Sequence, residues 1–193
     1  MKAVLRGPFA VAMLAGLFLA VVSATLLAFP PGPQARANGE NLAGTWVGAA
    51  EPVAQFAGIP FAHAPVGELR WRAPRGHAPR QGTQPADRFA PACMQDNRMV
   101  DWYSDVAAAF GHGPEVVGRP QGVSEDCLYL NVWSPNLSDD ARLPVMVYVH
   151  GGSNKGGWSY EPNYVGEALA RNGVVVVSIA YRLDGFGFFS PPW

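Results

Sequence analysis

Residues 143–160, "LPVMVYVHGGSNKGGWSY", decide the fold, because an apolar strand runs directly into a glycine-rich loop. "LPVMVYVH" (143–150) is a nearly continuous apolar run, which is typical of a strand buried on both faces of a sheet. Four glycines follow His150 within seven residues. Glycine has no Cβ, so such a loop lets backbone N–H groups come close to a bound group.

The segments that follow this loop complete an α/β unit. Pro162 to Arg171 has the pattern of a short helix, with proline in its first turn and Gly173 just past its end. "VVVVSIAY" (174–181) is rich in β-branched residues and predicts a second buried strand. Strand, glycine loop, helix and strand together form a βαβ unit, so the predicted fold class is α/β.

The chain before this unit predicts strands joined by long loops. "DCLYLNVWS" (126–134) alternates with period two, which indicates a strand, and short strands are expected between residues 38 and 58. Residues 58–91 contain a proline or glycine every few positions, which excludes long regular elements. "DWYSDVAAAF" (101–110) predicts one or two helical turns.

Composition excludes several classes of protein. The 193 residues are 49% hydrophobic and carry a formal net charge of −1, which leaves no electrostatic footprint for a nucleic-acid partner. The length fits one domain or part of a larger one. No His/Cys cluster has the spacing of metal ligands, and we expect no cofactor.

The N-terminus resembles an export signal. Lys2 and Arg6 precede a long uncharged apolar stretch, and Ala35-Arg36-Ala37 fits the small-x-small rule for cleavage. We therefore expect a signal peptide over residues 1–37 and a mature domain over 38–193. The apolar stretch is about long enough to cross a bilayer, so an uncleaved anchor is the alternative. Both readings predict export, to a secreted or periplasmic location.

Export bears on the two cysteines, Cys93 and Cys127. In an oxidising compartment two cysteines in one domain most simply form a disulfide. Two free buried thiols remain the alternative at this point.

Three known mechanisms place glycines after a buried strand. A phosphate-binding P-loop needs lysine after its last glycine, whereas Lys155 precedes Gly156. A dinucleotide fingerprint needs G-x-G-x-x-G opening a helix, and "GGSNKGG" lacks that spacing. The third mechanism is an oxyanion hole, in which backbone N–H groups bind the negative oxygen of an acyl intermediate. His-Gly-Gly-small is such an element in lipases and esterases, although a glycine-rich turn with a structural histidine would also account for the residues.

Four segments, taken in order, resemble one family. "FAGIPFAHAPVGELRW" (56–71), "SEDCLYLNVWSP" (124–135), "PVMVYVHGGS" (144–153) and "VVVVSIAYRLDGFGFFS" (174–190) are similar to motifs of the type-B carboxylesterase/cholinesterase family of α/β-hydrolases. The resemblance covers most of residues 53–190. It implies the N-terminal part of an α/β-hydrolase domain, with a small N-terminal β-sheet preceding the start of the central sheet.

The resemblance also implies roles for individual residues. Gly151, Gly152 and Ser153 match the oxyanion-hole loop, with the N–H groups of Gly152 and Ser153 as donors and the serine hydroxyl incidental. His150 is expected to orient this loop and not to act as a base.

Two further pairs match the family. Cys93 and Cys127 correspond to the disulfide that closes a large surface loop. Arg70 and Glu125 correspond to a structural ion pair, with generic surface charges as the alternative.

The chain departs from the family pattern in three places. Ala180 stands where the family often has Asn, so one polar contact near the loop is expected to be absent. Residues 115–127 lack the tryptophan that binds quaternary ammonium in cholinesterases, which disfavours choline esters. No G-x-S-x-G nucleophile motif occurs in the 193 residues.

The predicted function is therefore hydrolysis of small-molecule carboxylic esters by a serine esterase. This chain carries the oxyanion-hole loop of that esterase but not its catalytic serine, histidine and acidic residue. Alone, the chain should be inactive, and its incomplete sheet should expose an edge that invites aggregation. A non-catalytic adhesion or binding protein on the same scaffold is the alternative function, because a fold does not fix an activity. A decoy or pseudogene remnant is a third possibility. We expect no membrane partner unless residues 1–37 remain as an anchor.

Overall fold

A five-stranded mixed sheet organises the computed structural model, which describes residues 31–189. In spatial order its strands are β3 (Thr45–Val47), β4 (Val53–Pro60), β8 (Tyr129–Ser134), β10 (Val175–Ile179) and β9 (Val145–Val149). β9 and β10 are parallel, whereas the other neighbouring strands are antiparallel. The strands predicted at 126–134, 143–150 and 174–181 are thus confirmed as β8, β9 and β10.

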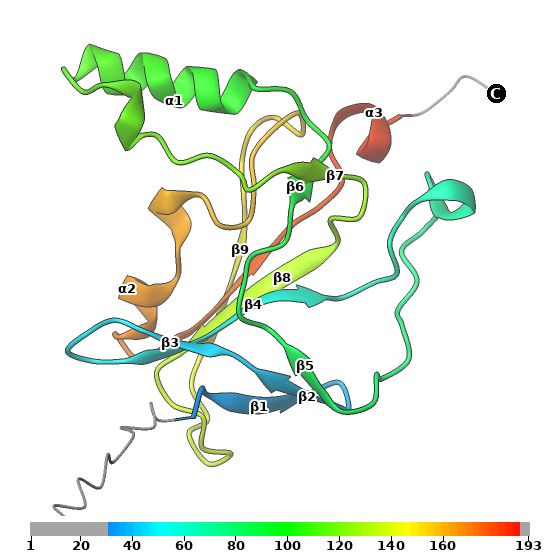
Figure 1. The fold of residues 1–193 in the computed structure, drawn as a ribbon, viewed down its shortest axis with the longest axis vertical. Coiled ribbons are helices and arrows are strands. Elements are labelled where there is room, and N and C mark those ends of the chain that lie inside the picture. Colours follow the sequence, from blue (N-terminus) through cyan, green and yellow to red (C-terminus); the bar gives the residue numbers. More distant parts are fainter. Residues whose placement is uncertain (1–30, 190–193) are drawn as a thin grey trace, which may run out of the picture. The chain divides into compact units, whose positions relative to one another are not determined.

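Two smaller sheets flank the central one. The first contains β1 (Gln34–Ala37), β2 (Glu40–Ala43) and β5 (Thr83–Pro85). It is the small N-terminal sheet that the sequence predicts, and it lies below the central sheet in Figure 1. The second pairs β6 (Ala92–Cys93) with β7 (Val123–Ser124). Of the predicted signal peptide, residues 1–30 lie outside the described part of the chain, and its last four residues form β1.

The helices are short, with one exception. They are α1 (Arg98–Ala109), α2 (Glu167–Ala170) and α3 (Asp184–Gly187), with 3₁₀ turns η1 (Gly67–Leu69), η2 (Pro114–Val116) and η3 (Pro162–Tyr164). α1 lies at the end of the central sheet away from the small N-terminal sheet (Figure 1). Across residues 31–189, no helix has the combination of length and apolar character needed to span a membrane.

Two helix predictions need correction. α1 has twelve residues, more than the one or two turns expected, and its alanine-rich second half favours the helix. The single helix expected from Pro162 to Arg171 is instead divided into η3 and α2, with Val165 extended between them. A Cβ at Gly166 would come 2.6 Å from the Trp133 ring and 2.8 Å from Val176, so close packing on the sheet requires glycine at the break.

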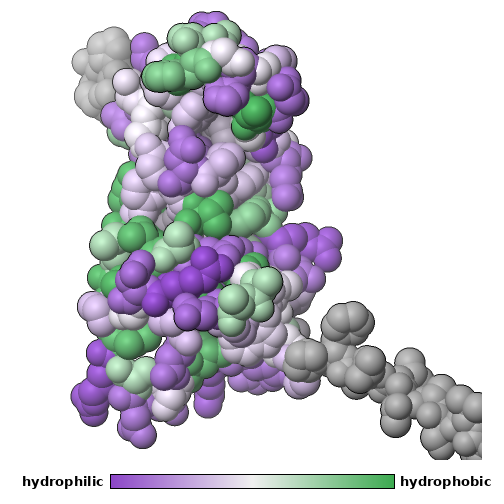
Figure 2. All heavy atoms as spheres, turned by 90° about the vertical axis from the view of Figure 1, so that its left-hand side faces the viewer, coloured by the Kyte–Doolittle hydropathy of each residue, from purple (hydrophilic) through white to green (hydrophobic). Residues whose placement is uncertain are grey.

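Four hydrophobic clusters bind these elements together. Leu42 and Phe56 join the small sheet to β4, and Trp133 with Val176 packs under α2. Val100 of α1 packs with Trp158, and the two cysteines pack with Leu183. On the side of the molecule that carries α1 and α2, hydrophobic residues form separate patches among polar ones (Figure 2).

β9 contradicts the prediction of a strand buried on both faces. Val145, Met146, Val147 and Val149 are all exposed. The reason is position: β9 is the edge strand of the sheet in the described chain, and only β10 pairs with it. An apolar sequence favours a buried strand, but a strand is buried only where neighbouring elements cover it. The exposed edge expected of an incomplete sheet is confirmed.

The exposed edge of β9 predicts self-association of the isolated 193-residue chain, because unpaired strand edges with apolar side chains template further pairing. Val147→Lys, in the centre of β9, should shift the chain from oligomers toward monomer in size-exclusion chromatography with light scattering. Leu137→Lys is the matched control, since Leu137 is an exposed apolar residue outside any strand. Equal association of both variants would contradict the role of the edge.

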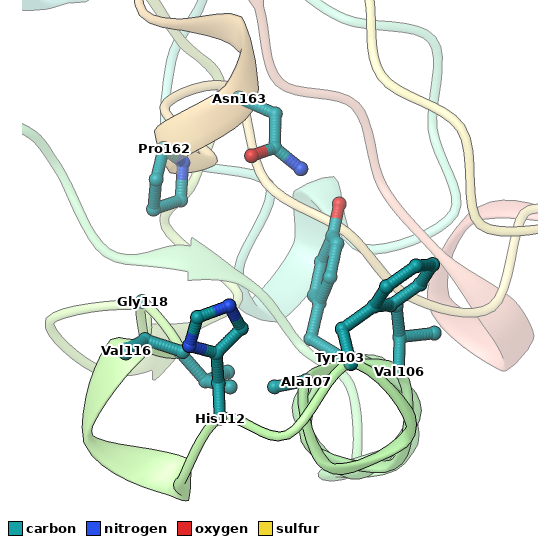
Figure 3. Close-up of a pocket in the computed structure, with 10 residues that line it drawn as sticks. Tyr103, Val106, Ala107, His112, Val116, Gly118, Pro162 and Asn163 are labelled. Atoms are coloured by element: carbon teal, nitrogen blue, oxygen red, sulfur yellow. The ribbon is translucent and has the colours of Figure 1, made fainter.

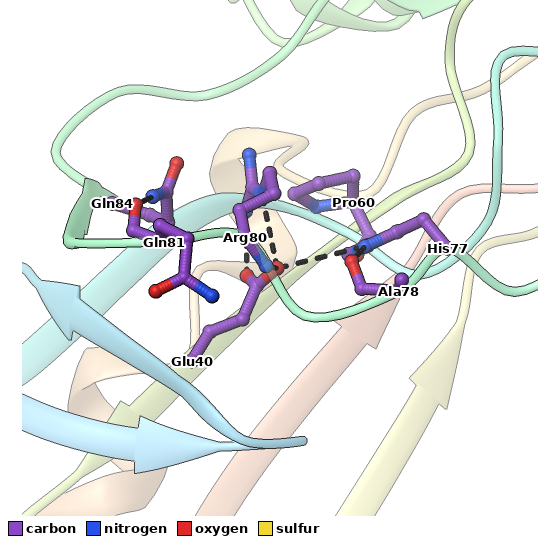
Figure 4. A network of polar contacts seen from close by, with 7 residues as sticks. All are labelled: Glu40, Pro60, His77, Ala78, Arg80, Gln81 and Gln84. Carbon is purple, nitrogen blue, oxygen red and sulfur yellow. Dashed lines mark hydrogen bonds and ion pairs between the residues drawn. The ribbon is translucent and has the colours of Figure 1, made fainter.

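A buried carboxylate ties the small N-terminal sheet to the loop that follows β4 (Figure 4). Glu40 is 3% exposed and accepts hydrogen bonds from the backbone N–H of Arg80 (2.7 Å) and from its Nε (3.0 Å) and Nη2 (2.7 Å). These bonds to Arg80 lower the pKa of Glu40 to about 2.

His77 extends this network. Its Nε2 lies 2.9 Å from the Pro60 carbonyl oxygen, and its Nδ1 lies 3.0 Å from that of Ala78 and 3.5 Å from Glu40 Oε1. Both ring nitrogens therefore face acceptors, and only the protonated imidazole donates to both sides. The carbonyls of Pro60 and Ala78, together with Glu40, accordingly raise the pKa of His77.

The two pKa shifts predict that the network of Glu40, His77 and Arg80 contributes most to stability in mildly acidic solution. The contribution of Glu40 is complete above its ordinary pKa of 4.5 and is lost as the pH falls toward 2. The contribution of His77 is complete below its ordinary pKa of 6.5 and is lost as the pH rises through its elevated value. Thermal unfolding followed by circular dichroism from pH 2 to 9 measures both limbs.

Two substitutions separate the limbs. Glu40→Gln should reduce the acid limb, to which Asp96 and Glu125 also contribute through their lowered pKa values. It should cost about 2 kcal/mol near pH 5.5, because Arg80 and His77 lose their charged partner. His77→Gln should flatten only the alkaline limb. Glu68→Gln changes a carboxylate that lacks this network and should leave the profile as it is; an unchanged acid limb in Glu40→Gln would contradict the assignment.

Candidate functional site

The loop after β9, residues 150–157, adopts a backbone that few residues tolerate. Gly152 and Gly157 have φ of +108° and +112°, and Ser153 and Asn154 have φ of +56° and +61°. A Cβ at Gly152 would overlap the carbonyl oxygen of Gly156, so this position requires glycine for space as well as for conformation.

Four consecutive N–H groups of this loop, at residues 151–154, have no protein acceptor among the described residues. The Gly152 carbonyl accepts the N–H groups of Lys155 (3.0 Å) and Gly156 (3.2 Å), which closes a tight turn. Within residues 31–189, none of Gly151, Gly152, Ser153 and Asn154 donates its own N–H to another protein group. Gly151, Gly152 and Ser153 line a cavity of about 620 Å³. The turn therefore presents three adjacent residues with free N–H groups, Gly151, Gly152 and Ser153, at the wall of a cavity.

His150 fixes the start of the loop. It is 3% exposed, and its ring stacks on Tyr181 with centroids 4.4 Å apart. The Tyr181 hydroxyl donates to the His150 carbonyl oxygen (2.8 Å), and His150 Nδ1 lies 3.0 Å from the carbonyl oxygen of Gly151. Burial lowers the pKa of His150, so the ring is neutral and donates from Nδ1 to the loop backbone.

Two groups from distant segments hold the rest of the loop. Gln95 Nε2 donates to the Gly157 carbonyl (2.7 Å), and the Gly157 N–H donates to Gln95 Oε1 (2.8 Å). The N–H of Asp184 at the start of α3 donates to the Asn154 carbonyl (2.7 Å). Sequence analysis did not identify Gln95; its position two residues after Cys93, at the anchored end of the loop between the cysteines, was the available signal.

Glu161 is a second residue that the sequence analysis missed. It is 2% exposed, and its carboxylate accepts the Trp158 N–H (2.9 Å) and the Tyr103 hydroxyl. Burial and the neighbouring Glu161 carboxylate raise the pKa of Tyr103, so the phenol stays protonated and donates. Glu161 also lines the 620 Å³ cavity, which places a buried carboxylate beside the loop.

Asn131 connects three parts of the fold beneath the site. The register of β4 against β8 shifts between Phe56 and Ile59, and the N–H of Gly58 in this bulge donates to Asn131 Oδ1 (3.0 Å). Asn131 Nδ2 donates to the hydroxyls of Ser159 (3.0 Å) and Ser178 (3.1 Å). One buried amide thus forms hydrogen bonds with a strand bulge, with the neighbouring strand and with the segment that follows the loop.

The remaining predicted residues meet at a second location. Cys93 and Cys127 are joined by a disulfide. Arg70 donates from Nε and Nη2 to the two carboxylate oxygens of Glu125 (2.5 and 2.6 Å), and these bonds lower the pKa of Glu125. All four side chains line one small cavity next to Leu183 and Phe186. They support the loop between the cysteines and α3 and do not reach the cavity at residues 151–153.

The described residues offer no grouping of three or more His, Cys, Asp or Glu side chains that could hold a metal ion. The groups that the structure places at the loop are free backbone N–H donors, a neutral buried imidazole and a buried carboxylate.

Comparison with known proteins identifies the family of the chain. The model of the carboxylesterase family matches residues 33–191. The chain belongs to the carboxylesterase family. Its α/β-hydrolase fold is shared with a solved thermophilic pNB esterase, which superimposes with a TM-score of 0.66 at 31% identity over 82% of this chain and 29% of that one.

Curated members of the carboxylesterase family are similar in sequence. The fumonisin B1 esterase of Sphingopyxis macrogoltabida is 44% identical over 140 residues, which cover 72% of this chain and 23% of that protein. The liver carboxylesterase of Sus scrofa is 43% identical over 145 residues, or 74% and 24% of the two chains. The chain thus spans about a quarter of the length of these carboxylesterases.

The close packing around Gly157 predicts a steric cost for any side chain there. A Cβ would overlap His150 Nδ1 and come within 2.7 Å of the Gly151 carbonyl oxygen and 3.0 Å of Glu161 Oε1. Gly157→Ala should destabilise the fold by about 3 kcal/mol, from the strained φ together with the overlap.

Gly111→Ala is the matched control, because Gly111 has φ of +79° but no atom within 4 Å of its Cβ position. It should cost only about 1 kcal/mol, the penalty of the left-handed backbone. Urea unfolding measures both variants, and equal losses would show that the contacts around Gly157 contribute nothing.

Proposed function

We propose that the protein is a serine carboxylesterase and that this chain supplies its oxyanion hole. The observation that carries the proposal is the run of unpaired N–H groups at the cavity wall, which includes those of Gly152 and Ser153, the two donors that the family resemblance implies. Donors that are fixed before the reaction stabilise the charge that develops on a carbonyl oxygen, and each contributes about two to three orders of magnitude in rate.

In this mechanism a serine attacks the ester carbonyl and the carbonyl oxygen becomes negative. The N–H groups of Gly152 and Ser153 donate to that oxygen. A histidine base takes the serine proton and gives it to the alcohol, which leaves an acyl-serine; water then attacks the acyl group, releases the acid and restores the serine. The Ser153 hydroxyl takes no part. His150 is not the base, because its ring is buried, neutral and engaged with the loop backbone.

The serine, its histidine and the acidic residue would come from polypeptide other than these 193 residues, in which no G-x-S-x-G motif occurs. The chain alone should therefore be inactive. The relatives named fumonisin B1 esterase and liver carboxylesterase support small-molecule carboxylic esters as the substrate class. No cofactor is required by this chemistry.

The location proposed for the esterase is outside the cytoplasm, either secreted or periplasmic. The Cys93–Cys127 disulfide supports this location, because such bonds persist in oxidising compartments. Residues 1–37 would provide the export signal or an anchor. Cleavage after Ala37 would separate β1 from β2, with which Gln34–Ala37 pairs along its whole length.

Gly152→Ala in the whole polypeptide tests the oxyanion role. The added Cβ would overlap the Gly156 carbonyl oxygen and displace both donors. The kcat for p-nitrophenyl butyrate should fall about 100-fold or more, with a smaller change in KM, because the interaction is made mainly in the transition state.

Two variants control this experiment. Ser153→Ala keeps the N–H and removes the hydroxyl, so its kcat should stay within about threefold of the unmodified protein. Gly76→Ala changes a remote glycine with no atom within 4 Å of its Cβ position and reports general effects of handling. Loss of activity in Ser153→Ala equal to that in Gly152→Ala would refute the backbone mechanism, and no hydrolysis of any ester by the unmodified polypeptide would refute the function.

A further inference from the structure

A second cavity lies next to the one at the glycine loop. It has a volume of about 350 Å³ and lies between the second half of α1, η2 and η3 (Figure 3). Most of its lining is apolar, with Val106, Ala107, Phe110, Val116, Val117 and Pro162, and His112 and Asn163 are among its polar groups. Cavities of this size and composition accept small apolar groups.

Tyr103 is the only residue that lines both cavities within the described part of the chain. Along α1, Met99 and Trp102 face the first cavity, whereas Val106 and Ala107 face the second. The segment after the loop divides in the same way: Glu161 and Tyr164 line the first cavity, and Pro162 and Asn163 line the second. The Tyr103 ring therefore stands at the point where the two spaces meet.

Tyr103 is held firmly in this position. Its hydroxyl donates to the buried carboxylate of Glu161, and it points toward Asn163 in Figure 3. Its ring lies edge-on to Trp158, with centroids 6.3 Å apart, and edge-on to Trp102 at 5.0 Å. A charge-assisted hydrogen bond and two aromatic contacts fix the ring as a wall and not as a mobile side chain.

We propose that Tyr103 determines the length of hydrocarbon chain that the ester site accepts, by closing the first cavity against the second. The proposal rests on the proposed esterase function, because it names the part of the ester that occupies these spaces. With Tyr103 present, a hydrocarbon chain is confined to the first cavity and cannot reach the apolar lining of the second. Without the ring, the two cavities become continuous and the end of a long chain enters the apolar lining of the second.

Binding of methyl ketones to the 193-residue chain tests this proposal without hydrolysis, since a ketone resembles the ester carbonyl but has no leaving group. The probes are pentan-2-one, octan-2-one and undecan-2-one, measured by isothermal titration calorimetry. In Tyr103→Ala the affinity for undecan-2-one relative to pentan-2-one should rise at least about tenfold over the unmodified chain, because each buried methylene contributes a factor of roughly four.

Three further variants serve as controls for Tyr103→Ala. Tyr103→Phe keeps the ring and should keep the short-chain preference, which also covers the case in which Tyr103→Ala fails to fold. Ala107→Phe fills the second cavity and, combined with Tyr103→Ala, should abolish the gain for undecan-2-one. Trp71→Ala is the control for loss of an aromatic ring, because Trp71 is exposed and lines neither cavity.

Two outcomes would overturn the proposal. One is a folded Tyr103→Ala chain with the same affinity ratio as the unmodified chain. The other is an unmodified chain whose binding of undecan-2-one is already weakened by Ala107→Phe, since the cavities would then be continuous with Tyr103 in place. Failure of the esterase function has a different signature: the ketones follow the expected pattern while the whole polypeptide hydrolyses no p-nitrophenyl ester.

Discussion

The proposed oxyanion hole depends on keeping backbone N–H groups of the glycine loop free in a fixed position. Backbone donors in proteins are normally paired, so a loop with free donors would rearrange to pair them unless its surroundings prevent it. Here the surroundings act at several points. Tyr181 holds the His150 carbonyl, Gln95 holds both polar groups of Gly157, and the N–H of Asp184 holds Asn154. An oxyanion hole gains its effect from such preorganisation, because no reorganisation is then required as charge develops.

The groups that hold the loop are themselves held by a polar core. Asn131 forms hydrogen bonds with the bulge in β4 and with two serine hydroxyls. Glu161 accepts hydrogen bonds from the Trp158 N–H and the Tyr103 hydroxyl. Buried polar groups are costly when unpaired, so each of these contacts specifies one arrangement of the segments that provide it. The disulfide and the Arg70–Glu125 pair fix the loop that carries Gln95 and Tyr103 at its base. The precision of the site thus comes from segments far apart in sequence.

This explains which features the sequence could predict. Strand positions, the glycine loop and the small N-terminal sheet follow from local patterns and from motifs, and they are confirmed. The exposure of β9 could not be predicted from its apolar sequence, because whether a strand is buried depends on the elements that cover it. The helix after the loop is broken where Gly166 meets Trp133 and Val176, which is a tertiary contact. Gln95 and Glu161 were missed because their roles depend on partners such as Gly157, 62 residues beyond Gln95.

Glu161 raises an electrostatic question, since it places a carboxylate in the cavity where an ester oxygen would become negative. Its two oxygens are occupied by the Trp158 N–H and the Tyr103 hydroxyl, which screen its charge locally, and Arg98 and Lys155 line the same cavity. Arg98 is paired with Asp96, so Lys155 is the cation there without an ion pair among the described residues. Tyr103 therefore has two linked roles: its hydroxyl screens Glu161, and its ring closes the cavity. Loss of the whole side chain should alter charge and chain length together, whereas Phe at this position alters the charge alone. That difference separates the electrostatic contribution of Tyr103 from its steric one.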